Sequence, residues 1–399
     1  MRRFYIFLLI LATGVSVAPA QERIPAEIIT DSVGEAVADS MAEHHGIRGL
    51  YDKVVNYFND TNKPKPKKKF DISFIGGPHY SSDTKFGIGM VAAANYRHSM
   101  ADTLDAEIPP SELSLVFDGT TSMYFSLGVV GTHVFPHDRA RINYKVSFSS
   151  VATKFWGIGY DENIVDSNEC KYKYLASRAE ADFVFRIARD LYLGPQVSFD
   201  YINGRHLDKP WLWHDQSHRT FNLGIGFTLQ YDTRDNLTAP TRGVYLGLTQ
   251  AFHPRWLMNK YAFTLTNLTF NFYHGLWKDA IMAFHAGARI TYGNTPWGLM
   301  STLGGSNNMR GYFEGRYRDK SEMDVCLELR QHVWRRNSLV AWIGAGTVFP
   351  RFQDITPGHI LPNWGIGYRW EFKKFVNVRL DLGFGRHQTG FIFSINEAF

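Results

Sequence analysis

The residues best suited to chemistry lie in a glycine-rich stretch at residues 303–319. Gly304 and Gly305 allow the backbone a positive φ, and Arg310-Gly311-Tyr312 presents a cation and an aromatic ring from a turn that glycine fits easily. A guanidinium group binds a carboxylate through two parallel hydrogen bonds, which a lysine cannot reproduce. The stretch therefore predicts a structured loop anchored by its arginine, and the chemistry we expect of it is recognition of a carboxylate.

Arrangements typical of an enzyme are missing from the sequence. His44-His45 has no spaced carboxylate or cysteine partner, and there is no HExxH motif, Cys/His cluster, Gly-x-Ser-x-Gly elbow or Walker loop. We therefore expect no catalytic, metal-binding or cofactor-binding residues, and a protein that is not an enzyme. A hydrolase whose site is assembled from separate strands stays open as a less favoured alternative. The formal net charge of +5 is small for 399 residues and does not indicate nucleic-acid binding.

The first residues predict a signal peptide at 1–20. Met1-Arg2-Arg3 is basic, residues 4–11 are apolar, and Ala18-Pro19-Ala20 is a small-residue cleavage site. After it no apolar run approaches the roughly 18 residues that a spanning helix needs. If the chain crosses a membrane, we expect it to do so with strands. The two cysteines, Cys170 in an expected loop and Cys326 in an expected strand, do not favour a disulfide.

Residues 21–69 differ from the rest in composition. Apolar residues from Ile28 to Phe58 recur at helical spacing, which predicts a short helical segment. In residues 63–69 prolines alternate with lysines, which predicts an extended, solvated linker. An alternative is that these lysines lie against anionic lipid head groups. We expect the helical segment to plug or cover the lumen described next.

From Phe70 onward the chain consists of segments that alternate apolar and polar residues. In residues 221–231, for example, Phe, Leu, Ile, Phe, Leu and Tyr alternate with polar residues and glycine. Sixteen such segments, joined by alternating short and long connections, predict an all-β fold, a sixteen-stranded antiparallel transmembrane β-barrel over residues 70–399. A change of phase after Tyr261 predicts a β-bulge near Thr266. The aromatic content of 15% also suits a barrel with a lipid-facing surface.

Three motifs resemble those of the BamA/TamA superfamily of outer-membrane barrels, of the surface-antigen type. The first is the loop at 303–319, which matches the lid loop of that family, a loop that folds back into the lumen. The second is a mid-barrel turn, and the third is the stretch from Val325 to Phe349. In addition, the chain end alternates to a terminal aromatic and resembles the assembly signal of outer-membrane barrels in general. The residues concerned are Gly304, Gly305, Arg310, Gly311 and Tyr312 in the lid, Asp232, Arg234, Asp235, Pro240 and Gly243 in the turn, and Phe391, Phe393, Ile395 and Phe399 at the end.

The resemblance also implies partners for the lid arginine. Glu328 matches the wall carboxylate that receives it, whereas Gly344 stands where the family places the aspartate of an Asp-x-Gly motif. Arg310 is therefore expected to bind Glu328 alone or to recruit another lumen carboxylate such as Asp381. Residues 21–69 are too short for a POTRA module, so we expect a member without a POTRA array. For the mid-barrel turn we expect a structural role.

By this resemblance the protein inserts or translocates proteins, or lipid, across the bacterial outer membrane through a lateral seam and a lid-gated lumen. The seam is expected between strands near Phe70 and Gly390. The alternatives are a passive diffusion channel, because a ring of this size encloses water, and a structural subunit of an envelope complex. The expected partners are outer-membrane lipid and client outer-membrane proteins or envelope-complex subunits, with no nucleic acid and no cofactor.

Overall fold

The computed structural model describes residues 70–96, 111–373 and 376–399. All of them belong to the second of two compact units, Phe58–Phe399. The expected signal peptide, the expected helical segment and linker at 21–69, and the connection at 97–110 lie outside the described residues. Those expectations therefore remain predictions.

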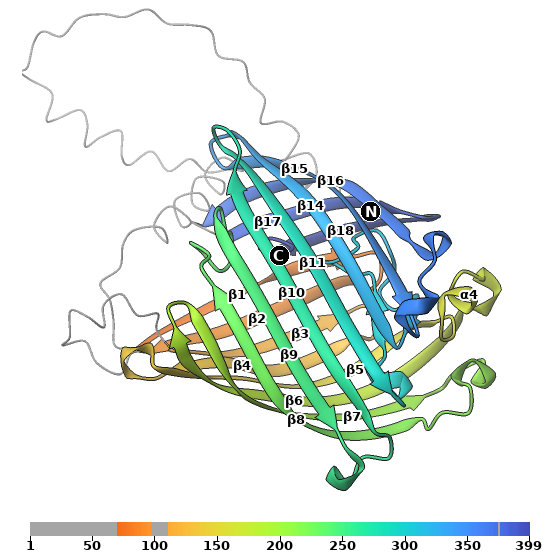
Figure 1. Cartoon of the computed structure of the whole chain (residues 1–399). Helices are drawn as coiled ribbons and strands as arrows, with labels where there is room; N and C mark the ends of the chain where they lie inside the picture. Colours follow the sequence, from red (N-terminus) through yellow and green to blue (C-terminus); the bar gives the residue numbers. More distant parts are fainter. Residues whose placement is uncertain (1–69, 97–110, 374–375) are drawn as a thin grey trace, which may run out of the picture. The chain divides into compact units, whose positions relative to one another are not determined.

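Sixteen strands pair antiparallel around a closed ring, which confirms the expected barrel (Figure 1). They follow one another around the ring in chain order, except that β14 pairs directly with β11. The barrel strands are β1 (Phe70–Ser81), β2 (Lys85–Tyr96), β3 (Ser111–Thr120), β4 (Phe125–Val134), β5 (Ala140–Phe155), β6 (Cys170–Ala188), β7 (Leu191–Arg205), β8 (Arg219–Asp232), β9 (Gly243–His253), β10 (Phe263–Gly275), β11 (Ala280–Gly293), β14 (Ser321–Trp334), β15 (Asn337–Phe349), β16 (Leu361–Lys373), β17 (Val376–Gly385) and β18 (Gln388–Ile395).

The remaining elements belong to the connections. β12 (Ser301–Leu303) and β13 (Tyr317–Asp319) form a two-stranded sheet between β11 and β14. The short helices are η3 (Pro136–Asp138), α4 (Tyr160–Asn163), η4 (Asp166–Asn168), η5 (Pro210–Trp213), η6 (Arg255–Leu257), η7 (Trp297–Leu299), η8 (Phe352–Asp354) and η9 (Pro357–His359). Over the described part of the chain, no helix has the length and apolar character needed to cross a membrane.

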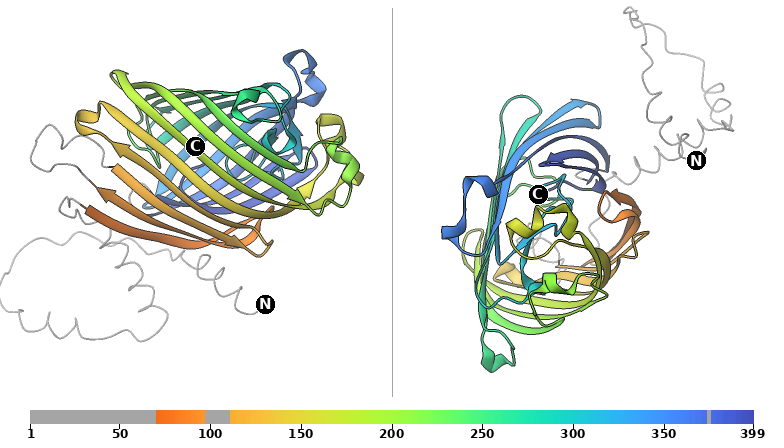
Figure 2. Two further views of the ribbon diagram at one scale, coloured as in Figure 1. Left: turned by 90° about the horizontal axis from the view of Figure 1, so that it is seen from below. Right: turned by 90° about the vertical axis from the view of Figure 1, so that its right-hand side faces the viewer.

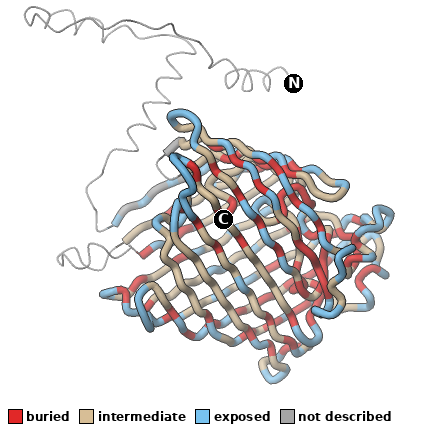
Figure 3. The backbone as a smooth tube through the Cα atoms, turned by 45° about the horizontal axis from the view of Figure 1, so that its top comes forward, coloured by how far each residue is buried: buried red, intermediate tan, exposed pale blue. Residues whose placement is uncertain are grey.

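Burial alternates along the strands, as a ring with an apolar outer face and a polar lumen requires (Figure 3). In β8, Phe221, Ile225 and Phe227 are each about two-fifths exposed, at 40%, 39% and 40%. The neighbouring Asn222 and Thr228 are only 1% and 2% exposed. The alternation therefore places the two faces as the sequence predicts.

The expected bulge near Thr266 is wrong. β10 pairs with β9 and with β11 in continuous register from Phe263 onward. Phe263 and Leu265 face inward instead, and they pack with Trp213 and Trp297 of the loops that fold into this end of the lumen. The change in pattern arises because the lumen wall is apolar near these loops, so apolar residues occupy the inner face there.

Both cysteines lie in strands. Cys170 is the first residue of β6, where it pairs with Phe155, so its expected position in a loop is wrong. Cys326 lies in β14, and both thiols are free and buried.

The barrel closes weakly between its first and last strands. β1 and β18 are in register at only two residue pairs, Tyr80 with Phe393 and Ser81 with Ile392. On its other side β1 pairs with β2 along its whole length. The seam is therefore held only at the rim where β1 ends.

Candidate functional site

The lid, residues 303–319, lies inside the ring of strands, where the right panel of Figure 2 shows the connection between β11 and β14. Its ends are fixed because Leu303 and Tyr317 pair in the small sheet of β12 and β13. Gly304, Gly305 and Gly311 have φ values of 105°, 110° and 111°, which other residues rarely adopt. The loop thus needs these glycines in order to fold back on itself.

Arg310 is the anchor of the lid and is only 1% exposed. Its Nη1 donates to Asp381 Oδ2 at 2.8 Å, and its Nη2 donates to Glu328 Oε2 at 2.5 Å. The guanidinium carbon also lies 3.7 Å from the centre of the Trp342 ring. The lid arginine is therefore held by two carboxylates and an aromatic face, all of them from the barrel wall.

Asp381 is the second acceptor of Arg310, a role that the sequence left as one of two alternatives. Gly344 occupies the position expected for the family's aspartate and pairs with Cys326 on β14. An Asp-x-Gly sequence occurs instead on β17, as Asp381-Leu382-Gly383. Gly383 lies against the lid, because a Cβ placed there would be 2.3 Å from Arg310 O. The aspartate thus binds the arginine side chain, and its neighbouring glycine leaves room for the arginine backbone.

Other buried charges extend this site into a network. Arg330 donates to Glu328, and Arg369 donates both to Asp381 and to Glu397. Arg379 donates to Asn307 of the lid at 3.2 Å. The network joins four arginines, Arg310, Arg330, Arg369 and Arg379, with three carboxylates, Glu328, Asp381 and Glu397. Because arginines outnumber carboxylates, removing one carboxylate leaves several buried cations without compensation.

Tyr312 fixes the lid beside the arginine. It is 2% exposed, its hydroxyl donates to Pro362 O at 2.6 Å, and the same oxygen accepts from Arg386 N at 2.7 Å. Burial raises the pKa of Tyr312 to about 12, so the hydroxyl keeps its proton. The lid is therefore tied to β16 and to the turn between β17 and β18.

The mid-barrel turn lies at the opposite rim from the lid. Arg234 forks onto Asp232, and Asp235 accepts hydrogen bonds from Thr241. Gly243 has a φ of 112°, and a Cβ there would lie 2.4 Å from Thr233 O. Pro240 is buried within the same turn. These residues bond to one another and not to the lid, which fits a structural role.

The expectation that alternation runs to Phe399 is wrong. Phe391 is 41% exposed on the lipid face, where Phe393 and Ile395 share its face of β18. Asn396 then has a φ of 70°, and the chain turns into the lumen. Glu397 accepts from Arg369 at 2.8 Å, and the Phe399 ring packs against the cluster around Cys326. The last residues bend inward because the buried arginines bind Glu397.

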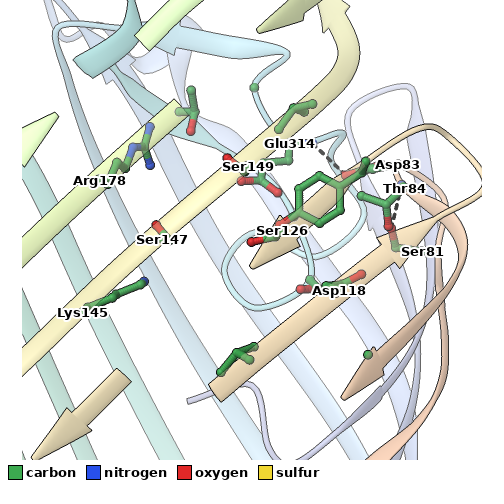
Figure 4. A pocket seen from close by; sticks show the side chains of 18 of the residues that line it. Ser81, Asp83, Thr84, Asp118, Ser126, Lys145, Ser147, Ser149, Arg178 and Glu314 are labelled. Carbon is green, nitrogen blue, oxygen red and sulfur yellow. Dashed lines mark hydrogen bonds between the residues drawn. The ribbon is translucent and has the colours of Figure 1, made fainter. Parts of the chain in front are cut away.

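A cavity of about 1110 Å³ lies beside the lid, and both polar and apolar residues of the seam and of the opposite wall line it (Figure 4). Lys145, Ser147 and Arg178 project into it from β5 and β6, and Asp118 lies on β3. Glu314 of the lid also opens into this space. No group of three or more His, Cys, Asp or Glu side chains within the described ranges could hold a metal ion.

The sequence did not predict the role of several residues in the site. Arg369 and Arg379 face inward by simple alternation, but only the network gives them a role. Glu328 was expected as the partner of Arg310, and the structure confirms it. Arg330 stands two residues away on the same face of β14, which is only a weak signal for an inward pair. Nothing in the sequence indicates that Glu397 joins them, because it follows the strand.

A closed barrel that folds an arginine-bearing loop into its lumen defines a class of outer-membrane protein. The profile of the Omp85 superfamily domain matches residues 113–399, and the chain belongs to that superfamily of bacterial outer-membrane barrels that translocate or insert proteins. No match was found among curated proteins.

Solved structures share this fold at low sequence identity. BamA from Haemophilus ducreyi lacking POTRA domains 1–3 is 12% identical, with a TM-score of 0.56 over 83% of this chain and 71% of that chain. CdiB from Acinetobacter baumannii is 12% identical, with a TM-score of 0.51 over 84% of this chain and 60% of that one. CdiB from Escherichia coli is 11% identical, with a TM-score of 0.53 over 83% and 64%. This chain therefore spans less than two thirds of either CdiB chain.

Proposed function

We propose that this protein inserts or translocates proteins, or lipid, across the bacterial outer membrane through the seam between β1 and β18, with the lid gating the lumen. The observation that carries the proposal is the short pairing of these strands, which have two residue pairs in register. The least extensive of the other interfaces pair eight residues each. Within the described strands, Phe70–His79 has no partner on the β18 side, so its backbone groups can pair with an incoming strand.

The position at which β18 ends also supports the proposal. Because the chain turns inward at Asn396, β18 stops short, and the beginning of β1 has no partner on that side. No catalytic group is needed for strand exchange, so we propose a role that is not enzymatic. The proposed partners are membrane lipid and client outer-membrane proteins or envelope-complex subunits.

The test is a disulfide across the seam. The cysteines belong at the end of β1 and not near Phe70, because the seam strands are in register at Tyr80 with Phe393 and Ser81 with Ile392. Cysteines at Ser81 and Ile392, on a background without Cys170 and Cys326, would lie at the spacing of paired antiparallel residues, about 4.5 to 5.5 Å between Cα atoms. We expect insertion or translocation to stop on oxidation and to return on reduction.

The passive channel is the second candidate, and the cavity of about 1110 Å³, whose lining includes charged side chains such as Lys145 and Arg178, favours it. The same locked variant separates the two functions. If ion conductance in planar bilayers persists with the seam locked while no client or lipid transport is detected in either redox state, the protein is a pore. A matched disulfide between Leu127 and Phe148, which are paired on β4 and β5, controls for oxidation itself.

A further inference from the structure

Two consecutive backbone amides of the lid reach the two sides of the seam. Phe313 N donates to Gln388 Oε1 at 3.0 Å, and Gln388 is the first residue of β18. Glu314 N donates to Asp83 Oδ2 at 2.8 Å, and Asp83 lies in the turn between β1 and β2 (Figure 4). A single stretch of lid backbone is therefore bonded to both strands whose separation would open the seam.

The lid also lies directly on the inner face of the last strands. A Cβ at Gly390 of β18 would be 3.0 Å from Gly311 Cα, and one at Gly311 would be 2.6 Å from Gly383 C on β17. Such close approach is possible only because all three residues are glycines. The tip of the lid is therefore pressed against the seam strand, and Arg310 next to it is anchored by its carboxylates.

The direct contacts between the seam strands are few by comparison. Beyond the two pairs in register, Ser82 N donates to Phe391 O at 3.2 Å, and Phe391 N donates to Ser82 Oγ at 3.0 Å. On the outer face the rings of Tyr80 and Phe391 lie 5.9 Å apart. Two additional hydrogen bonds from the lid are thus a substantial share of what holds this rim together.

We propose that the lid peptide Phe313-Glu314 is a clasp that holds the seam shut from the lumen side, so that the seam opens only when the bond to Gln388 or the bond to Asp83 is released. The inference deepens the proposed function, because it assigns the control of the seam to two acceptor side chains. Asp83 and Gln388 are positioning residues, which act through the strands that they hold.

The experiment measures the seam distance itself and needs no transport assay. Nitroxide labels at positions 86 and 389, both exposed in the native chain and on opposite sides of the seam, report its width by pulsed electron resonance in liposomes. A second pair, at Leu127 on β4 and Phe183 on β6, is also exposed, spans two continuously paired interfaces and serves as the control. Cys170 and Cys326 are replaced by serine in every variant.

Asp83→Leu and Gln388→Met remove the acceptors at similar size, whereas Asp83→Asn keeps an acceptor oxygen. We expect each acceptor-free variant to raise the open fraction at the 86–389 pair about fivefold, the effect of one typical hydrogen bond, with the control pair unchanged. Asp83→Asn should match the parent. Heat-modifiable migration shows which variants have folded, and each acceptor-free variant tests the proposal by itself if the other does not fold.

Unchanged distances in folded acceptor-free variants would overturn the clasp. Equal widening in Asp83→Asn and Asp83→Leu would also overturn it, because the contact would then not act as a hydrogen bond to that oxygen. The seam could widen in the acceptor-free variants while the barrel locked by the disulfide between positions 81 and 392 still transports. That result would support the clasp and reject the proposed function. The two failures are therefore distinguishable.

Discussion

Arg310 in the lid donates to Asp381, 71 positions further along the chain, and the two side chains are 1% and 0% exposed. Glu328, the other acceptor, is also 0% exposed. A charge removed from water in this way is stable only while its partners remain. The position of the lid is therefore fixed by a contact that the barrel creates when it closes.

Loss of the arginine should free the lid without unfolding the barrel. Arg310→Ala leaves Asp381 and Glu328 with one cation fewer, and breaking a buried pair costs about 3 to 5 kcal/mol. We expect rapid trypsin cleavage in the lid and a barrel that still migrates as folded. Arg310→Lys should behave like the alanine variant, because one ammonium group cannot fork onto both carboxylates. A lysine variant as resistant to trypsin as the parent would contradict this account.

Asp381 should be the more sensitive acceptor. It binds Arg310 and Arg369 and lies 3.8 Å from Arg379, whereas Glu328 binds Arg310 and Arg330. Asp381→Ala should therefore lower the urea midpoint of the barrel more than Glu328→Ala does. The double variant Arg310→Ala/Asp381→Ala should be less destabilised than the sum of the single variants, because they share a contact. Strict additivity in urea titrations would show that they act independently.

A methyl group on the lid tip should also displace it. Gly311 has a φ of 111°, and its Cβ would lie 2.6 Å from Gly383 C, so Gly311→Ala combines backbone strain of about 1 to 3 kcal/mol with a steric clash. Gly358→Ala is the matched control, because no atom lies within 4 Å of its Cβ position. Trypsin should cleave the lid faster in the first variant only. Equal cleavage rates would mean that the tip tolerates displacement from Gly383.

The lipid face can be tested at two adjacent residues. Phe148 is 45% exposed on the outer face of β5, and Ser147 lines the cavity. Phe148→Arg should cost about 2 to 4 kcal/mol at mid-depth, and Ser147→Arg much less, in urea titrations of barrels in liposomes. Phe227→Arg, on the same face as Leu223, should resemble Phe148→Arg. The lumen-facing neighbours of Phe227 in β8, Gly224 and Thr228, are not used as controls. A Cβ at Gly224 would be 2.3 Å from Ser198 Oγ, and Thr228 is buried. Equal losses at Phe148 and Ser147 would contradict the alternation.

The contact between Asp83 and the lid should depend on pH. Burial raises the pKa of Asp83 from 3.8 to about 6, although the amide of Glu314 and the charges of Lys85 and Lys154 act in the opposite direction. The docked state thus binds the proton more tightly than a released, solvated Asp83 does, so docking should weaken as pH rises from about 4 to about 6 and change little above that. Burial, followed by the charge of Asp83, also raises the pKa of the Glu314 carboxyl, so ionisation of Glu314 weakens docking in the same direction.

The measurement is the fraction of lid cleaved by an acid-tolerant protease between pH 4 and pH 7. We expect protection to fall across this range in the parent and to change less in Asp83→Asn, which does not ionise. A parent whose protection rises with pH would have the opposite sign and would contradict this account of the contact.

The barrel can be predicted from the amino-acid sequence alone. Strand number and the two faces follow from the period-two alternation, which is a local property of each segment. The mid-barrel turn was also readable, because Asp232, Arg234 and Asp235 bond within a few residues of one another. Glu328 was reached through the resemblance of its strand to a known family, and not from its neighbours in sequence.

The partners of the lid and the place where the seam is held depend on the folded barrel. Asp381, Gln388 and Asp83 meet the lid from distant parts of the barrel, and their approach depends on the register around the whole ring. The inward turn after Ile395 and the apolar inner face at Phe263 have the same origin, because the filled lumen decides which residues face it. Local alternation specifies which face of a strand a side chain takes, whereas its partner is set by contacts that form when the ring closes.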